Sequence, residues 1–95
     1  MDTEKLKLDF GELIRQRRGK VPLGQEALAD KASLHRTHLS LLERGLRMPS
    51  LIVILKLAEA LGTTASSLMR ELEQGVVWTT RAQPLRATRK AKPKE

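Results

Sequence analysis

Residues 25–45 read QEALADKASLHRTHLSLLERG, and their hydrophobic pattern predicts two short helices joined by a tight turn. In the first helix, residues 25–32, Leu28, Ala29 and Ala32 have the spacing of one buried face. Two small alanines on that face allow another helix backbone to approach closely. The pattern therefore predicts a compact pair in which the first helix supports the second.

The second helix is predicted to start near residue 35 or 36 and to end near Arg44, with Gly45 as its C-terminal stop. Successive residues are about 100° apart around a helix. Leu39 and Leu42 therefore fall on the core side, and Leu34 fills the turn. The opposite face carries no carboxylate and consists of Arg36, Thr37, Ser40, Leu41 and Arg44.

The outward face of the second helix has side chains suited to reading DNA. Arginine can bind two acceptors of guanine in the major groove, and Thr, Ser and Leu can hydrogen-bond base edges or contact a thymine methyl. Two helices joined by a short turn form the helix-turn-helix unit, whose second helix enters the major groove. The predicted base-contacting residues are Arg36, Thr37, Ser40 and Leu41.

Many residues match a known helix-turn-helix pattern in one register: Gln25, Leu28-Ala29, Leu34, Leu39-Ser40, Leu42-Glu43-Arg44-Gly45, Arg47, Pro49-Ser50, Leu57-Ala58, Ala60-Leu61-Gly62 and Leu68. On these residues, the chain resembles the Cro/C1 repressor-like (XRE) family over about residues 8 to 74. The run RTHLSLLERGLRMPSL also resembles restriction–modification controller proteins, a subgroup of that family. The resemblance implies an all-α, five-helix lambda-repressor-like DNA-binding domain.

The resemblance also implies roles for individual residues. Gln25 matches a residue that clamps a phosphate at the start of the first helix, and Arg18 and Glu43 match a buried ion pair. Two positions depart from the family pattern, because Ser33 stands where glycine is usual and His35 where a Ser or Asp cap is common. Both departures concern the stability of the turn and the cap rather than function.

Phosphate contacts are also predicted beyond the second helix. Arg44 and Arg47 flank its exit, where they form either a phosphate clamp or a solvated basic loop. Ser50 opens the next helix, whose N-terminus would add backbone donors. The predicted phosphate-contacting residues are Gln25, Arg44, Arg47 and Ser50.

Three more helices complete the predicted domain. A helix over about residues 5–18 places Leu6, Phe10, Leu13 and Ile14 inward. The basic cluster at its end, Arg15, Arg17, Arg18 and Lys20, is read either as a solvated helix end or, for Arg18, as an ion-pair partner. A helix capped by Thr64 carries Leu68, Met69 and Leu72 and ends before Gly75.

The helix after Ser50 has more apolar surface than one core face requires. Its sequence is LIVILKLAEALG, and one predicted face is Leu51, Leu55, Ala58 and Leu61. The wider apolar arc is either core on two sides or a partner surface. The second reading predicts a homodimer through the fourth and fifth helices, which would bind an inverted repeat with recognition helices about 34 Å apart.

Length, charge and composition limit the possible domain organisation and localisation of the protein. The 95 residues allow one small domain, residues 1–75, and the net charge of +7 is concentrated in a basic, flexible C-terminal tail, residues 76–95. Residues 76–80 either add a strand across the dimer or dock Trp78 on the domain, and residues 81–95 are either solvated or add phosphate contacts. The sequence shows no cysteine, membrane span or signal peptide, so a cytoplasmic, nucleoid-associated protein is expected.

No catalytic residue, cofactor or metal site is predicted. His35 and His38 share a helix, but no third ligand joins them, and no nucleophile elbow or Walker lysine is present. The predicted function is sequence-specific binding of double-stranded DNA, which regulates transcription as a repressor or autoregulator. The alternative is an antitoxin or other protein-interaction module. Membrane binding through the tail ranks lowest, because the tail has no apolar face.

Overall fold

The computed structural model describes residues 2–75, and within them the chain is all α-helical. The five helices are α1 (Thr3–Lys20), α2 (Gln25–Lys31), α3 (Arg36–Glu43), α4 (Leu51–Ala60) and α5 (Ala65–Gln74). The predicted five-helix fold is therefore confirmed. The predictions for residues 76–95, including the strand and the docking of Trp78, lie outside the described residues, and the domain boundary at residue 75 stays a prediction.

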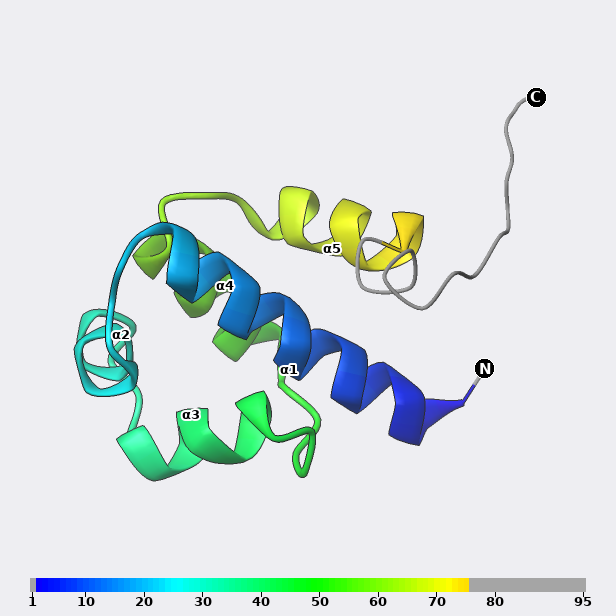
Figure 1. The fold of residues 1–95 in the computed structure, drawn as a ribbon, viewed down its shortest axis with the longest axis horizontal. Helices are drawn as coiled ribbons and strands as arrows, with labels where there is room; N and C mark the ends of the chain where they lie inside the picture. Colours follow the sequence, from blue (N-terminus) through cyan, green and yellow to red (C-terminus); the bar gives the residue numbers. More distant parts are fainter. Residues whose placement is uncertain (1, 76–95) are drawn as a thin grey trace.

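The long helix α1 forms the centre of the arrangement (Figure 1). It packs against α3 on one side and α5 on another, while α2 packs on α3 and α4, and α4 packs on α5. The helix-turn-helix pair, α2 and α3, thus lies at one side of the domain, and α4 and α5 complete the core behind it.

Side-chain caps fix the starts of three helices. Asp2 accepts hydrogen bonds from the backbone N–H groups of Glu4 and Lys5. Ser50 accepts from Val53 N–H, and Thr64 accepts from Ser67 N–H, as the sequence predicted for both caps. These bonds satisfy donors that have no partner within the helix.

Three helices end in the same hydrogen-bond motif, in which two N–H groups beyond the helix bond back to its last turn. At the end of α2, Ser33 N–H donates to Asp30 O and Leu34 N–H donates to Ala29 O. The equivalent residue has a left-handed backbone in each case: Gly45 and Gly62 both have φ 73°, and Ser33 has φ 56°. Ser33 is the only residue other than glycine with positive φ in residues 2–75.

A close backbone contact places α3 against α1. A Cβ added to Gly11 would lie 2.5 Å from Leu42 O and 2.6 Å from Glu43 O. Both atoms belong to the backbone of α3, so they cannot move aside as a flexible side chain would. Glycine at this position therefore sets how closely the end of α3 approaches α1.

Most residues that were predicted to point inward are buried, but one predicted face of α4 is only partly buried. The buried apolar residues are Phe10, Leu13, Ile14, Leu28, Ala29, Ala32, Leu39, Leu42, Val53, Leu57, Ala58, Ala60, Leu61 and Leu68. The face predicted for Leu51, Leu55, Ala58 and Leu61 is divided in the structure, because Leu51 is 73% and Leu55 48% exposed whereas Ala58 and Leu61 are buried. The helix α4 is apolar on nearly every side, so its hydrophobic pattern alone did not fix which arc packs inward.

Within residues 2–75, no single helix meets the length and hydropathy of a membrane span, and α4 and α5 do so only as a pair bent by 102°.

Candidate nucleic-acid interface

The helix α3 has one buried face and one outward face, as predicted. Leu39 and Leu42 are both 0% exposed and attach the helix to the core. Arg36 and Thr37 are exposed, and Ser40 is half-buried. The two leucines therefore fix the rotation of the helix and turn its polar side outward.

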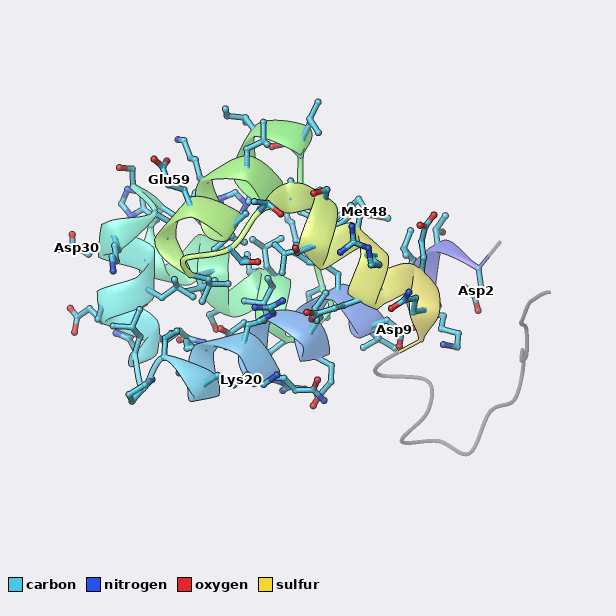
Figure 2. The ribbon with its side chains drawn as sticks, turned by 90° about the horizontal axis from the view of Figure 1, so that it is seen from above. Asp2, Asp9, Lys20, Asp30, Met48 and Glu59 are labelled. Atoms are coloured by element: carbon cyan, nitrogen blue, oxygen red, sulfur yellow. The ribbon has the colours of Figure 1, made fainter. Side chains whose placement is uncertain are left out.

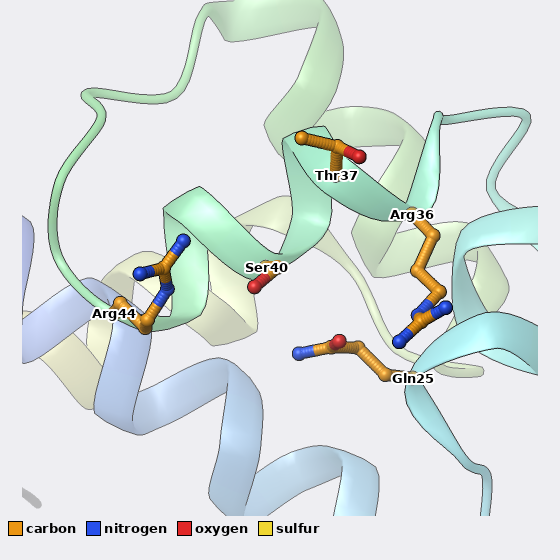
Figure 3. A pocket seen from close by; sticks show the side chains of 5 residues that line it. All are labelled: Gln25, Arg36, Thr37, Ser40 and Arg44. Atoms are coloured by element: carbon orange, nitrogen blue, oxygen red, sulfur yellow. The ribbon is translucent and has the colours of Figure 1, made fainter.

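The polar side of α3 and the start of α2 enclose a hollow of about 320 Å³. Its lining residues are Gln25, Arg36, Thr37, Ser40 and Arg44. Figure 3 shows Arg36 reaching from the start of α3 toward Gln25 on α2, with Ser40 further along α3 and Arg44 just past its end. The structure thus brings three of the four predicted base-contacting residues and two of the four predicted phosphate-contacting residues to one surface.

The arginines of this hollow differ from those of α1 in their partners. Among residues 2–75, Arg36 and Arg44 form no ion pair, and no carboxylate of these residues lines the hollow. The arginines near the end of α1 all bind carboxylates: Arg15 binds Glu12, Arg17 binds Glu71 and Arg18 binds Glu43. The three arginines of α1 are therefore paired within the domain, whereas the side chains of Arg36 and Arg44 are exposed.

A buried hydrogen-bond network supports the hollow from beneath. Glu43, with a side chain that is 2% exposed, accepts from Arg18 Nε at 2.8 Å and from Arg18 Nη2 at 3.0 Å. Gln25 Nε2 donates to the same carboxylate at 3.0 Å. Arg18 Nη1 also donates to Leu23 O at 3.2 Å, which fastens the connection between α1 and α2. The predicted ion pair is present in the structure, and it links α1, α2 and α3.

The bond from Gln25 to Glu43 was not predicted from the sequence. It holds the amide of Gln25 beside α3, so the side chain lines the hollow with its position already fixed. The two residues are 18 positions apart, and no local pattern in the sequence indicates that they meet.

The other predicted contact residues lie outside the hollow. Leu41 is half-buried on α3, and Arg47 is exposed in the connection from α3 to α4. Ser50 is exposed, and its hydroxyl oxygen accepts from Val53 N–H at 3.3 Å. Arg47 and Ser50 thus lie in the connection from α3 to α4.

The two histidines lie at the start of α3 and within it. His35 precedes α3 without a side-chain cap, and His38 is half-buried on the helix. Among the described residues, no group of three His, Cys, Asp or Glu side chains lies close enough together to hold a metal ion.

A second surface of interest is an exposed apolar face on α4, which we call the α4 apolar surface. It consists of Leu51, Ile52 and Leu55, which are 73%, 57% and 48% exposed. Leu46 and Met48, in the connection before α4, are also exposed. On helix α5, Leu68 is buried and Met69 and Leu72 are half-buried. Three large apolar side chains on one helix face are typical of an interaction surface.

Comparison with known proteins gives one consistent family. A family model described as helix-turn-helix matches residues 14–68, a span that contains all of α2, α3 and α4. The control protein C.BamHI of Bacillus amyloliquefaciens is 43% identical over 68 residues, which cover 70% of this chain and 84% of the relative. The control protein C.MunI of Mycoplasma sp is 36% identical over 70 residues, which cover 73% and 95%.

A solved structure agrees with these relatives. The restriction-modification controller protein C.AhdI from Aeromonas hydrophila superposes with a TM-score of 0.64 at 40% sequence identity. The superposition covers 65% of this chain and 94% of that protein. The comparisons of sequence and of fold therefore both find control proteins among the proteins similar to this chain.

Proposed function

The chain belongs to the helix-turn-helix family of DNA-binding transcription regulators, and on that premise we propose that it binds an inverted-repeat operator as a homodimer. We further propose that the genes it controls are those of a restriction–modification system, its own gene included. Members of this family act by binding double-stranded DNA and regulating transcription, and they are not enzymes.

The observation that carries the proposal is the polar hollow on α3. Arg36, Thr37 and Ser40 would enter the major groove, because their side chains project from the outward face of a helix fixed by buried leucines. Leu41, next to this face, would contact a thymine methyl. Arg36 has no ion pair with any residue between 2 and 75, so it can bind guanine without first breaking one of these pairs.

Phosphate contacts would fix the register of the protein on the duplex. Arg44 and Arg47 would each neutralise a phosphate, and Ser50 would contribute through the N-terminus of α4. Gln25 would donate the second N–H of its amide to a phosphate, while the first N–H stays hydrogen-bonded to Glu43.

The homodimer is inferred from the α4 apolar surface. A two-fold axis would bring two copies of this surface together and remove six large apolar side chains from water. Each buried leucine or isoleucine contributes roughly 1.5–3 kcal/mol. The same axis would set the two α3 helices about one DNA turn apart, roughly 34 Å.

The relatives favour control of restriction–modification genes over the antitoxin alternative. Two of them are named control proteins, and the solved structure is of a restriction-modification controller protein. A regulator of this kind works on chromosomal DNA, so we place it at the nucleoid in the cytoplasm.

The test is binding of the full chain to the duplex upstream of its own gene and to a scrambled duplex, at about 0.15 M salt. A preference of roughly 10³-fold or more for the native sequence is expected of a specific regulator. Equal binding to both duplexes would count against this operator. Selection from random DNA would then decide between another operator and nonspecific binding.

A further inference from the structure

The buried carboxylate of Glu43 connects the core of the domain to the polar hollow on α3. Its Oε1 atom accepts hydrogen bonds from Arg18 Nη2 and from Gln25 Nε2, each at 3.0 Å. The Glu43 side chain is 2% exposed and is not among the residues that line the hollow, whereas Gln25 is. The carboxylate therefore reaches the hollow through the side chain of Gln25.

Glu43 also decides which end of the Gln25 amide faces it. The nitrogen and oxygen ends of a glutamine amide have nearly the same shape, so either can face a neighbour that both donates and accepts. An ionised carboxylate only accepts hydrogen bonds. Glu43, whose charge is balanced by the Arg18 guanidinium, thus selects the nitrogen end of Gln25. The other end, Gln25 Oε1, receives no hydrogen bond from any group in residues 2–75.

The donor that reaches toward this amide is the guanidinium of Arg36. Figure 3 shows Arg36 extending toward Gln25, whose amide nitrogen points away from it. A guanidinium has several N–H donors in a rigid plane, so two of them can bind guanine while another bonds to a neighbouring acceptor. The arginine side chain is long and flexible, and a fixed acceptor beside its guanidinium restricts its conformations.

We propose that Glu43 is a positioning residue for sequence recognition, an inference that rests on the base contact proposed for Arg36. Glu43 holds the nitrogen of the Gln25 amide, Gln25 Oε1 accepts a hydrogen bond from Arg36, and the guanidinium of Arg36 is thereby directed at one guanine. The buried pair of Arg18 and Glu43 would then contribute to the sequence preference at one base pair as well as to the stability of the fold.

The experiment measures the sequence preferences of full-chain variants by selection from a library of operator variants, at about 0.15 M salt. Glu43→Gln replaces the carboxylate by an amide that can also donate, so Gln25 can turn its oxygen toward position 43 and its NH2 group toward Arg36. We expect the preference for the base pair that Arg36 reads to fall by roughly threefold to tenfold, the effect of about one hydrogen bond. Preferences at the other base pairs should not change.

A second variant leaves the buried pair intact and so does not depend on Glu43→Gln folding. Gln25→Met removes the amide from a half-buried side chain of similar length, while Arg18 still binds both oxygens of Glu43. This variant should relax the same base pair to a similar extent. The double variant Gln25→Met/Glu43→Gln should relax it no further, because the two residues act in series. Overall affinity should also fall for Gln25→Met, which lacks the proposed phosphate contact, so the preferences are compared rather than the affinities.

The matched control is Glu71→Gln. Arg17 of α1 binds Glu71 as Arg18 binds Glu43, but Glu71 is not among the residues that line the hollow. Figure 2 shows the last turns of α5 at the end of the molecule that carries Asp2, with α2 at the other end. The control also weakens an ion pair of α1, and it should leave the preference at every base pair unchanged.

The outcomes separate this positioning role from the proposed base contact. If Arg36→Ala leaves the sequence profile unchanged, both are rejected. If Arg36→Ala relaxes one base pair but Glu43→Gln or Gln25→Met does not, Arg36 reads that base pair without this support and only the positioning role is rejected. A change spread over all base pairs of the half-site in Glu43→Gln, or relaxation of the same base pair in Glu71→Gln, would mean that Glu43 acts through the stability of the domain, which also rejects the positioning role.

Discussion

Arg18 holds both carboxylate oxygens of Glu43, with Nε 2.8 Å from Oε2 and Nη2 3.0 Å from Oε1. The two partners are buried to different extents, since the Arg18 side chain is 23% exposed and that of Glu43 only 2%. Removing the arginine leaves the buried Glu43 carboxylate without its cationic partner. Removing the charge of Glu43 leaves an arginine whose side chain still reaches water. The two halves of the pair should therefore differ in their effect on stability.

We expect Arg18→Met to lower the free energy of unfolding by about 3–5 kcal/mol. Glu43→Gln should cost only about 1–2 kcal/mol, because glutamine keeps an acceptor for Arg18. Urea unfolding of the full chain measures both. The control is Arg15→Met, which removes an exposed pair with Glu12 and should cost less than about 1 kcal/mol. Equal losses for Arg18→Met and Arg15→Met would contradict the structural role of the pair.

Gly11 and Gly19 lie on the same helix and should respond to alanine with opposite signs. A Cβ at Gly11 would lie 2.5 Å from Leu42 O, so α1 and α3 would have to separate, at a cost of about 1–3 kcal/mol or more. A Cβ at Gly19 meets nothing within 4 Å, so Gly19→Ala should stabilise the helix by about 0.5–1 kcal/mol. Thermal unfolding of both variants checks this, and a stabilising Gly11→Ala would show that the two helices are further apart than described.

The left-handed backbone at Ser33 should make Ser33→Gly a stabilising change. At φ 56° a residue with a Cβ is strained by roughly 1–2 kcal/mol, part of which is offset by the greater freedom of glycine in the unfolded chain. We expect a gain of about 1 kcal/mol in urea unfolding. The reverse change, Gly62→Ser, tests the same effect at φ 73° with open space around the Cβ and should destabilise by a similar amount. If both variants match the wild type, strain at the helix ends is negligible.

The sequence predicted the elements whose signals are local. Leu39 and Leu42 were placed inward by helical spacing, and Ser50 and Thr64 were identified as caps by residue type. Gly45 was predicted to end its helix, and it does so with the left-handed backbone for which glycine is suited. Each of these features depends on residues within one turn, so the local sequence suffices.

Features that depend on packing between distant segments could not be predicted from the local sequence. Leu51 and Leu55 were grouped on one face with Ala58 and Leu61, but α4 is apolar around most of its circumference, and only the packing of the other helices decides which arc is buried. The bond from Gln25 to Glu43 and the burial of Asp9 also went unpredicted. The base and phosphate contacts remain predictions, because they concern a partner that the fold alone does not contain.

Arg36 and Arg47 should differ in how their loss affects DNA binding. Arg36→Ala removes the proposed base contact and should cost about 1–3 kcal/mol on the operator while relaxing the preference at one base pair. Arg47→Ala should weaken binding to all sequences alike and reduce the slope of log affinity against log salt by about 1. Selection from a library of operator variants measures the preference, and titration at several salt concentrations measures the slope. Superimposable sequence profiles for wild type and Arg36→Ala would reject the base-contact assignment.

The α4 apolar surface should decide the oligomeric state. Leu51 is the first residue of α4 and 73% exposed, so Leu51→Asp adds a charge where the helix N-terminus tolerates it and the fold should persist. In a two-fold dimer the change acts twice, and losing two leucine contacts of roughly 1.5–3 kcal/mol each would weaken the dimer by about 100-fold or more. Sedimentation equilibrium measures the dissociation constant, and circular dichroism verifies the fold. The operator affinity should fall with it, because one subunit reaches only one half-site.

The matched control for the dimer is Val21→Lys. Val21 is also exposed, at 37%, but it lies at the end of α1, where a positive charge suits the helix terminus. This variant should keep both the wild-type dissociation constant and the operator affinity. A wild-type chain that sediments as a monomer at the concentration where it fills its operator would reject the homodimer. If Leu51→Asp leaves the dissociation constant of the dimer unchanged, the interface does not include the α4 apolar surface. The separation of the two α3 helices could then no longer be inferred from that surface.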